Sequence, residues 1–184
     1  MTRKILLAAA LLALLPAAPA AAQLLAVEPF GTYGFYGSLP ETSARLEGGW
    51  GFGARATLRF APRLAVFGTA QRSAPELLGQ LPFGVAVSGD RVTVDHWSAG
   101  LEFSRYRGDA GPGALPLALS AGIGQVRYED GPTDLAGSLG ASAGARLGPN
   151  FALRYGVTDY ISRYDGDRGW VNQVFVRVGG ELSL

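Results

Sequence analysis

The chain has 184 residues, with 16 basic and 15 acidic side chains, no cysteine, 27 glycines and 48% hydrophobic residues. A net charge of +1 gives no basic excess for contacts with phosphates, so the composition argues against a nucleic-acid partner. The lack of cysteine excludes a disulfide scaffold, a thiolate metal site and a cysteine nucleophile. The length suits one domain rather than two.

The first 22 residues are organised like a secretory signal peptide. Two basic residues precede an apolar run over residues 5–15, and two prolines and a final group of alanines lead to Ala22. The apolar run is too short to cross ~30 Å of hydrocarbon as a helix. A retained anchor that continues to Val27 is the alternative, but it would need prolines in the helix interior. We therefore expect cleavage after Ala22, which divides the chain into a signal peptide at 1–22 and one domain at 23–184.

The expected mature domain contains no lysine, because Lys4 is the only lysine in the chain. Soluble surfaces rely on a mixture of Lys, Arg, Glu and Asp for hydration. The missing lysines therefore indicate that much of the surface does not face water. No stretch beyond Val27 approaches the ~20 apolar residues of a membrane helix. If the domain crosses a membrane, it must do so as strands.

Apolar and small or polar residues alternate through the domain with the period of two that is typical of β-strands. The alternation is clear over 50–60, 97–103, 115–123, 139–147, 151–157 and 174–184, and weaker over 29–37 and 64–72. The turns at 61–63 and 148–150 are short, whereas most other connections are longer and polar. We therefore expect eight antiparallel strands, with short turns at one end and longer loops at the other.

This arrangement is the plan of a bacterial outer-membrane barrel. An unpaired backbone N–H or C=O in hydrocarbon costs several kcal/mol, so only helices or closed sheets can cross. Aromatic residues near the expected strand ends, such as Trp50, Phe60, Phe103, Phe151 and Trp170, suit girdles at the membrane interfaces. We expect an all-β fold, an eight-stranded antiparallel up-and-down transmembrane β-barrel preceded by a cleaved signal peptide.

The alternating strands, the glycine-rich small-residue face and the terminal run over 171–184 resemble the small OmpA/OmpX-type eight-stranded family, over roughly residues 28–184. The resemblance implies a porin-like barrel in the bacterial outer membrane. It also implies outer-membrane lipid, lipopolysaccharide where the organism has it, and the barrel-assembly machinery as partners of a monomer. Such barrels usually end in an aromatic residue that helps the assembly machinery recognise the last strand. Leu184 takes that place here, a departure that bears on assembly more than on the fold.

The alternation assigns one face of the strands to lipid and the other to the lumen. The expected lipid-facing residues are Trp50, Phe52, Leu58, Phe60, Trp97, Leu101, Phe103, Leu117, Leu119, Leu139, Leu153, Tyr155, Val174 and Val176. The expected lumen ion network consists of Arg55, Arg59, Glu102, Arg146, Arg154, Arg177 and Glu181.

An eight-stranded barrel has an interior just wide enough for side chains, so a general solute pore is not expected. Charges withdrawn from water must be paired or hydrogen-bonded, and we expect the network to form a plug that holds the strands in register. Two carboxylates among five guanidiniums would make each glutamate the partner of several arginines. A gated ion path is the alternative.

Two functions from other classes remain open. A secreted lipocalin-like barrel would turn the apolar face inward around a small apolar ligand, but its outer surface would then lack lysine and carry little acid. The sequence His96-Trp97-Ser98 resembles the His-aromatic-Ser pattern of outer-membrane lipid A deacylases, in which a serine near a histidine can act as a nucleophile. Ala99 stands where that family has Asn. With Trp97 facing lipid, His96 and Ser98 would face the lumen, away from an acyl substrate.

No other pattern points to catalysis, a cofactor or a metal. Asp165-Gly166-Asp167 matches a fragment of a calcium loop but lacks the further ligands and the downstream Glu. The acidic loops around Glu129 and Asp165 are candidates for divalent-cation bridges to lipid phosphates. We expect a non-enzymatic protein without cofactor or metal, whose role is structural or surface interaction.

Overall fold

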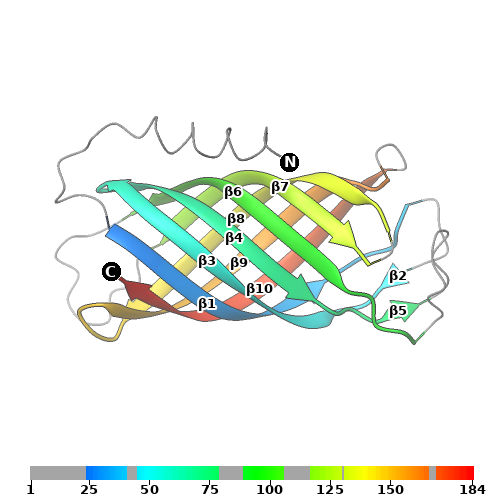
Figure 1. The fold of residues 1–184 in the computed structure, drawn as a ribbon, viewed down its shortest axis with the longest axis horizontal. Helices are drawn as coiled ribbons and strands as arrows, with labels where there is room; N and C mark the ends of the chain where they lie inside the picture. The colour runs from blue at the N-terminus through cyan, green and yellow to red at the C-terminus, as the bar shows by residue number, and fades with distance from the viewer. Residues whose placement is uncertain (1–23, 41–44, 79–88, 106–116, 130, 166–168) are drawn as a thin grey trace, which may run out of the picture.

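The computed structural model describes residues 24–40, 45–78, 89–105, 117–129, 131–165 and 169–184. The expected signal peptide lies outside these residues. Figure 1 shows a single barrel whose strands are tilted against its long axis. The described residues contain no helix that is long and apolar enough to span a membrane.

Eight antiparallel strands close the barrel in the order β1-β10-β9-β8-β7-β6-β4-β3. Their bounds are β1 Leu24–Phe35, β3 Gly49–Ala61, β4 Leu64–Ser73, β6 Val94–Ser104, β7 Ala118–Tyr128, β8 Thr133–Arg146, β9 Phe151–Arg163 and β10 Trp170–Ser183. Strand β1 closes the sheet by pairing with β10 on one side and β3 on the other. The expected fold class and strand number are confirmed.

The two ends of the barrel differ as expected. At the turn end, the connections between β3 and β4 and between β8 and β9 are short, and the last strand ends there. At the loop end, two further strands that the sequence analysis missed, β2 Arg45–Leu46 and β5 Leu77–Leu78, pair outside the barrel. Their leucines Leu46 and Leu77 are almost completely buried together with Leu39. Buried apolar side chains hold these two short strands together, and strands of two residues show no period of two in the sequence.

The outer face of the barrel is apolar. Among the residues expected to face lipid, those with large exposed side chains are Trp50, Phe52, Trp97, Leu101, Phe103, Leu117, Leu119, Leu139, Leu153, Tyr155 and Val176. Leu58, Phe60 and Val174 are half-buried. Leu58, for example, lies opposite Leu25 on β1 and Val66 on β4, whose apolar side chains cover it from both sides.

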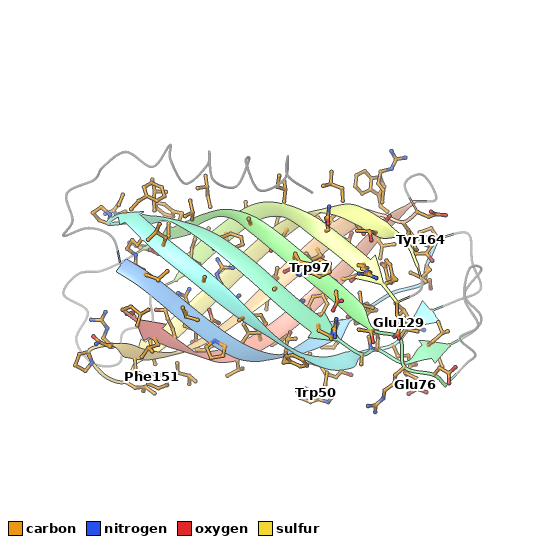
Figure 2. The ribbon with its side chains drawn as sticks, in the orientation of Figure 1. Trp50, Glu76, Trp97, Glu129, Phe151 and Tyr164 are labelled. Atoms are coloured by element: carbon orange, nitrogen blue, oxygen red, sulfur yellow. The ribbon has the colours of Figure 1, made fainter. Side chains whose placement is uncertain are left out.

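Aromatic side chains gather near both ends of the outer face. Trp50 and Trp170 lie at the loop end, at the start of their strands, and are 76% and 69% exposed. Phe103 and Phe151 lie at the turn end. Figure 2 shows Trp50 and Phe151 pointing away from the barrel. This distribution is typical of interfacial girdles on either side of an apolar band.

We predict that Ile123→Arg destabilises the folded barrel far more than Leu64→Arg does. Ile123 lies in the middle of β7 and is 71% exposed, whereas Leu64 is the first residue of β4, at the turn end. An arginine on the lipid face costs roughly 2–4 kcal/mol at the bilayer midplane and about 0–1 kcal/mol near an interface. Denaturant unfolding in lipid vesicles measures both variants. Equal losses would contradict the assignment of this face to hydrocarbon.

Candidate functional site

Six charged side chains meet inside the barrel toward its turn end. We call them the ionic cluster: Glu28, Arg55, Glu102, Arg154, Arg177 and Glu181. They come from β1, β3, β6, β9 and β10, and all except the half-buried Glu181 are at most 8% exposed. Successive side chains of a strand point to opposite faces of the sheet. Each of these six residues occupies an inward-facing position of its strand, so its side chain lies in the lumen.

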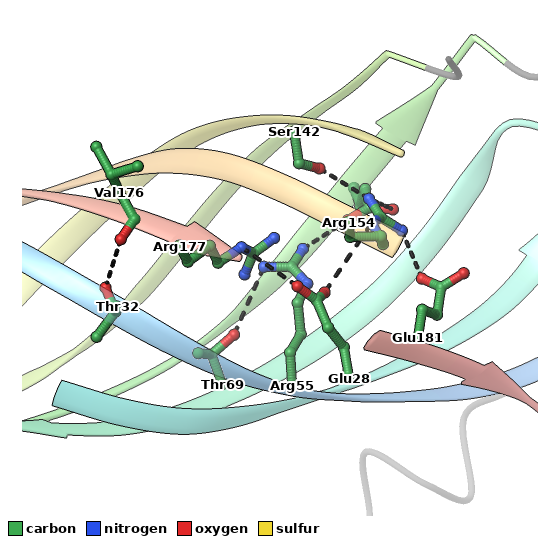
Figure 3. A network of polar contacts seen from close by, with 10 residues as sticks. Glu28, Thr32, Arg55, Thr69, Ser142, Arg154, Val176, Arg177 and Glu181 are labelled. Carbon is green, nitrogen blue, oxygen red and sulfur yellow. Dashed lines mark hydrogen bonds and ion pairs between the residues drawn. The ribbon is translucent and has the colours of Figure 1, made fainter. Parts of the chain in front are cut away.

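Arg154 makes the most carboxylate contacts in the ionic cluster. Its guanidinium lies 2.6 Å from Glu181, 3.6 Å from Glu102 and 4.0 Å from Glu28. It also donates a hydrogen bond of 2.7 Å to the Ser142 hydroxyl. One arginine on β9 therefore holds carboxylates from three other strands, as the close view in Figure 3 shows for Glu28 and Glu181.

The other two arginines bind one carboxylate each. Arg55 donates to Glu102 over 2.7 Å, and its guanidinium carbon lies 3.7 Å from the centre of the Phe67 ring. Arg177 lies 3.6 Å from Glu28. Three guanidiniums thus face three carboxylates, so the formal charges of the ionic cluster cancel. A buried group of charges needs this balance, because each unpaired charge would carry a large desolvation cost.

A glycine on the last strand allows the first strand to approach closely. A Cβ atom at Gly179 would lie 2.6 Å from the carbonyl oxygen of Pro29, 2.7 Å from Cβ of Phe30 and 3.1 Å from Cγ of Glu28. A larger residue at position 179 would therefore displace the β1 strand beside Glu28.

Two residues of the expected ion network lie outside the ionic cluster. Arg59 is half-buried near the end of β3, beside a register irregularity, and Arg146 is the last residue of β8 and is exposed. Both occupy inward-facing positions, as expected, but they lie at the turn-end rim of the barrel, where the strands end. From the sequence they were expected to meet Glu102 and Glu181 in one network. Glu102 contacts Arg55 and Arg154, and Arg55 lies four residues deeper along β3 than Arg59.

Glu28 is absent from the ion network expected from the sequence. The first strand was expected to begin at Pro29, with no clear phase, whereas β1 begins at Leu24. Exposed Leu25 and Val27 alternate with buried Ala26 and Glu28, and this alternation was the available signal. Glu102 contacts two arginines, Arg55 and Arg154, while Arg154 contacts three carboxylates.

The loop-end half of the lumen is filled differently, chiefly with aromatic rings. Gln173 accepts a hydrogen bond of 2.6 Å from Nε2 of His96 and donates one to the Tyr128 hydroxyl. The rings of Tyr160 and Phe175 each lie 4.8 Å from the imidazole, centre to centre. All of these side chains are at most 1% exposed. The barrel interior is therefore closed by an aromatic layer above the ionic cluster.

His96 and Ser98, the two residues of the deacylase pattern, both point into this layer. The side-chain partner of His96 is Gln173, and Ser98 lies 3.4 Å from the Tyr160 hydroxyl. Trp97 between them is exposed on the outer face. The imidazole thus has the surroundings of a structural histidine, hydrogen-bonded and sealed from both water and the outer face.

The acidic loop residues have protein partners where the structure describes them. Glu129 accepts a hydrogen bond of 2.8 Å from the backbone N–H of Thr93, which holds the pKa of this carboxyl below its usual range. Asp134 accepts one of 3.3 Å from the backbone N–H of Asp165. Asp167 lies outside the described residues. Within the described ranges, no group of three or more His, Asp or Glu side chains could hold a metal ion.

Comparison with known proteins identifies the architecture. No family model and no curated protein sequence matches the chain. Neisserial surface protein A matches with a TM-score of 0.58 and 12% identity, over 87% of this chain and 97% of that one. The outer-membrane protein OprG from Pseudomonas aeruginosa matches with a TM-score of 0.59 and 10% identity, over 89% of this chain and 96% of that one. The fold is that of the small eight-stranded outer-membrane barrels.

A third structure supports the same conclusion about this outer-membrane-type barrel. Ail, the attachment invasion locus protein of Yersinia pestis, matches with a TM-score of 0.51 and 14% identity, over 89% of this chain and 99% of that one. In each comparison nearly all of the other chain is covered, so the whole barrel is shared.

We predict that Arg154→Gln is strongly destabilising while Arg72→Gln is nearly neutral. Both arginines lie 2.6 Å from a carboxylate, but the Arg154 side chain is 9% exposed and that of Arg72, which binds Asp95, is 58% exposed. Removing one partner of a buried ion pair costs on the order of 3–5 kcal/mol, because the remaining charge stays buried. A solvated pair contributes little. Urea unfolding in detergent measures both variants, and similar losses would show that the ionic cluster does not stabilise the barrel.

Proposed function

We propose that the chain is an integral barrel of the bacterial outer membrane, with a structural or surface-interaction role and without an open pore. The observation that carries this proposal is the polarity of the barrel. Its interior holds three arginines and three glutamates, while large apolar side chains such as Leu101 and Ile123 are exposed on its outer face. A polar lumen within an apolar outer band is the pattern of strands that cross lipid.

The same polarity weighs against a secreted lipocalin-like barrel. A soluble barrel that holds a small apolar ligand needs an apolar interior and a hydrated outer face. Here an apolar ligand in the lumen would have to displace the ionic cluster or the buried rings around His96. The outer face would meanwhile leave residues such as Trp50, 76% exposed, in contact with water.

The contents of the lumen support a closed barrel. An ion that crossed the turn-end half would have to break the contact of Arg55 with Glu102 or those of Arg154, and each leaves a buried charge uncompensated. It would then meet the packed rings of Tyr128, Tyr160 and Phe175, each of which is 1% exposed. We therefore favour a packed interior over a gated ion path.

The barrel would serve to present its loops at the cell surface. Its partners would be outer-membrane lipid, lipopolysaccharide where the organism has it, and the barrel-assembly machinery during insertion, and we expect it to act as a monomer. The loop end carries the small β2–β5 sheet over a buried leucine core, which fixes the described parts of these two loops relative to each other. A fixed loop surface suits recognition better than an unstructured one.

We expect the protein to sediment with the outer-membrane fraction and to resist extraction by alkaline carbonate. After extraction in detergent, unheated and boiled samples should migrate differently on gels, because a closed barrel stays compact until heat unfolds it. Signal-peptide processing can be checked on the same sample by N-terminal sequencing, which should begin at Gln23. A protein that stays in the supernatant after lysis without detergent would overturn the proposal.

A lipid A deacylase is the remaining enzymatic candidate, and we propose that the protein lacks this activity. We predict that His96→Ala leaves the mass spectrum of lipid A unchanged relative to cells expressing the original protein or carrying an empty vector. The reason is that His96 is 0% exposed and its Nε2 is engaged by Gln173. A loss of one acyl chain on expression, reversed by His96→Ala, would establish the enzyme instead.

A further inference from the structure

A shallow groove of about 400 Å³ lies on the outer face of the barrel, over β6, β7 and β8. Trp97 on β6 and Leu135 on β8 flank it, because both pair with Gln125 on β7, between them. Ala99 and Ile123 line the groove one outward position closer to the turn end. Apart from Gln125, the outward side chains of this first groove are apolar, and the small side chain of Ala99 leaves it open.

A second groove adjoins the first across Ile123 and Leu135, which line both. Ile161 and Trp170, on β9 and β10, lie on its far side. Ile123 and Leu135 are 71% and 74% exposed, so they form a ridge with a groove on each side. Charges of both signs lie at the loop end of the second groove, on Asp134, Arg163 and Asp165. Two apolar grooves separated by one ridge match neighbouring acyl chains of a single lipid molecule.

A row of charged side chains crosses the outer face at the loop end of the first groove. Arg72, Asp95 and Arg127 pair in register across β4, β6 and β7. Arg72 donates hydrogen bonds of 2.6 Å and 2.9 Å to the two carboxylate oxygens of Asp95. Arg127 is exposed, and it binds no carboxylate in the part of the chain that the structure describes. The row therefore presents one guanidinium beside the groove.

Arg127 lies where the outward positions of the strands change from apolar to charged. Its row is one outward position nearer the loops than the row of Trp97 and Gln125. Tryptophan side chains favour the level of the lipid headgroups. Glu129, nearer the loop end than Trp97 (Figure 2), accepts a hydrogen bond from the backbone N–H of Thr93. Arg127 is therefore at the headgroup level, and the first groove runs from it into the hydrocarbon.

We propose that the two grooves and Arg127 bind one molecule of lipopolysaccharide, with a lipid A phosphate on the guanidinium and acyl chains in the grooves. Guanidinium groups bind phosphate oxygens through a fixed fork of N–H donors. The longer loops of outer-membrane barrels face the cell exterior, which places the loop end in the outer leaflet, where lipopolysaccharide resides. The proposal rests on the outer-membrane assignment above and names the place at which its lipid partner binds.

The test compares the original protein with variants that change the charge or the groove. Arg127→Gln removes the guanidinium, and Ala99→Leu narrows the first groove without changing any charge. Arg105→Gln is the matched control, because Arg105 is an exposed arginine just beyond the turn end of β6. Each protein is folded in a non-ionic detergent and verified by its gel shift on heating. It is then titrated with lipid A, with lipid A stripped of its phosphates and with phosphatidylglycerol, and native mass spectrometry counts the bound lipids.

We expect the original protein and Arg105→Gln to bind one lipid A with equal affinity. Arg127→Gln should bind it about tenfold more weakly, because a charge-assisted hydrogen bond is lost. Removal of the phosphates should weaken binding to the original protein and abolish its difference from Arg127→Gln. Ala99→Leu should weaken the binding of both forms of lipid A. Equal lipid A affinity in the original protein and Arg127→Gln, equally tight phosphatidylglycerol in the original protein, or no bound lipid A would each overturn the proposal.

Failure of this site is distinguishable from failure of the membrane assignment. A protein that sediments with the outer membrane, but whose lipid A binding does not depend on Arg127, would refute the site and leave the assignment standing. A protein that stays in the supernatant after lysis without detergent would refute both.

Discussion

Charge neutralisation inside a narrow barrel is the constraint on which this structure depends. Eight strands leave an interior just wide enough for side chains, so a charge placed there has little water to solvate it. Arg154 meets this constraint by contacting Glu28, Glu102 and Glu181 at once, and Arg55 and Arg177 complete the balance. The inward register of five strands is thereby tied to one set of ion pairs.

The two halves of the lumen are filled by different kinds of side chain. The turn-end half uses paired charges, and the loop-end half uses aromatic rings with the Gln173 amide between His96 and Tyr128. Rings give volume and apolar contact, while charge pairs give direction, because a guanidinium binds a carboxylate in few geometries. The charged half therefore specifies register, and the ring half excludes water. Buried leucines of the outer loops continue the apolar layer beyond the strands.

Periodicity predicted the strands because the pattern in the sequence is the direct consequence of their geometry. Alternation over 50–60 or 139–147 follows from side chains that point to opposite faces, and no tertiary information is needed to read it. The same pattern predicted that Arg55, Glu102 and Arg154 face inward. Which of them meet could not be predicted, because contacts across the lumen depend on the stagger between strands, and periodicity does not determine the stagger. Glu28 was missed because the first strand was expected to begin only at Pro29, and β2 and β5 because two-residue strands have no period.

The ionic cluster joins parts of the chain that are farthest apart in sequence. Glu28 belongs to the first strand, and its partner Arg177 and the neighbouring Glu181 belong to the last, which pairs with the first to close the barrel. Such contacts form only after almost the whole chain has found its place, and until then their loop-closure entropy is unrewarded. An open sheet that lacks β10 would hold Glu28 and Arg154 without their full complement of partners. A partly assembled barrel therefore lacks the ion pairs that stabilise the complete one. Closure by the last strand and neutralisation of the interior occur together, and folding into lipid should be cooperative and slow.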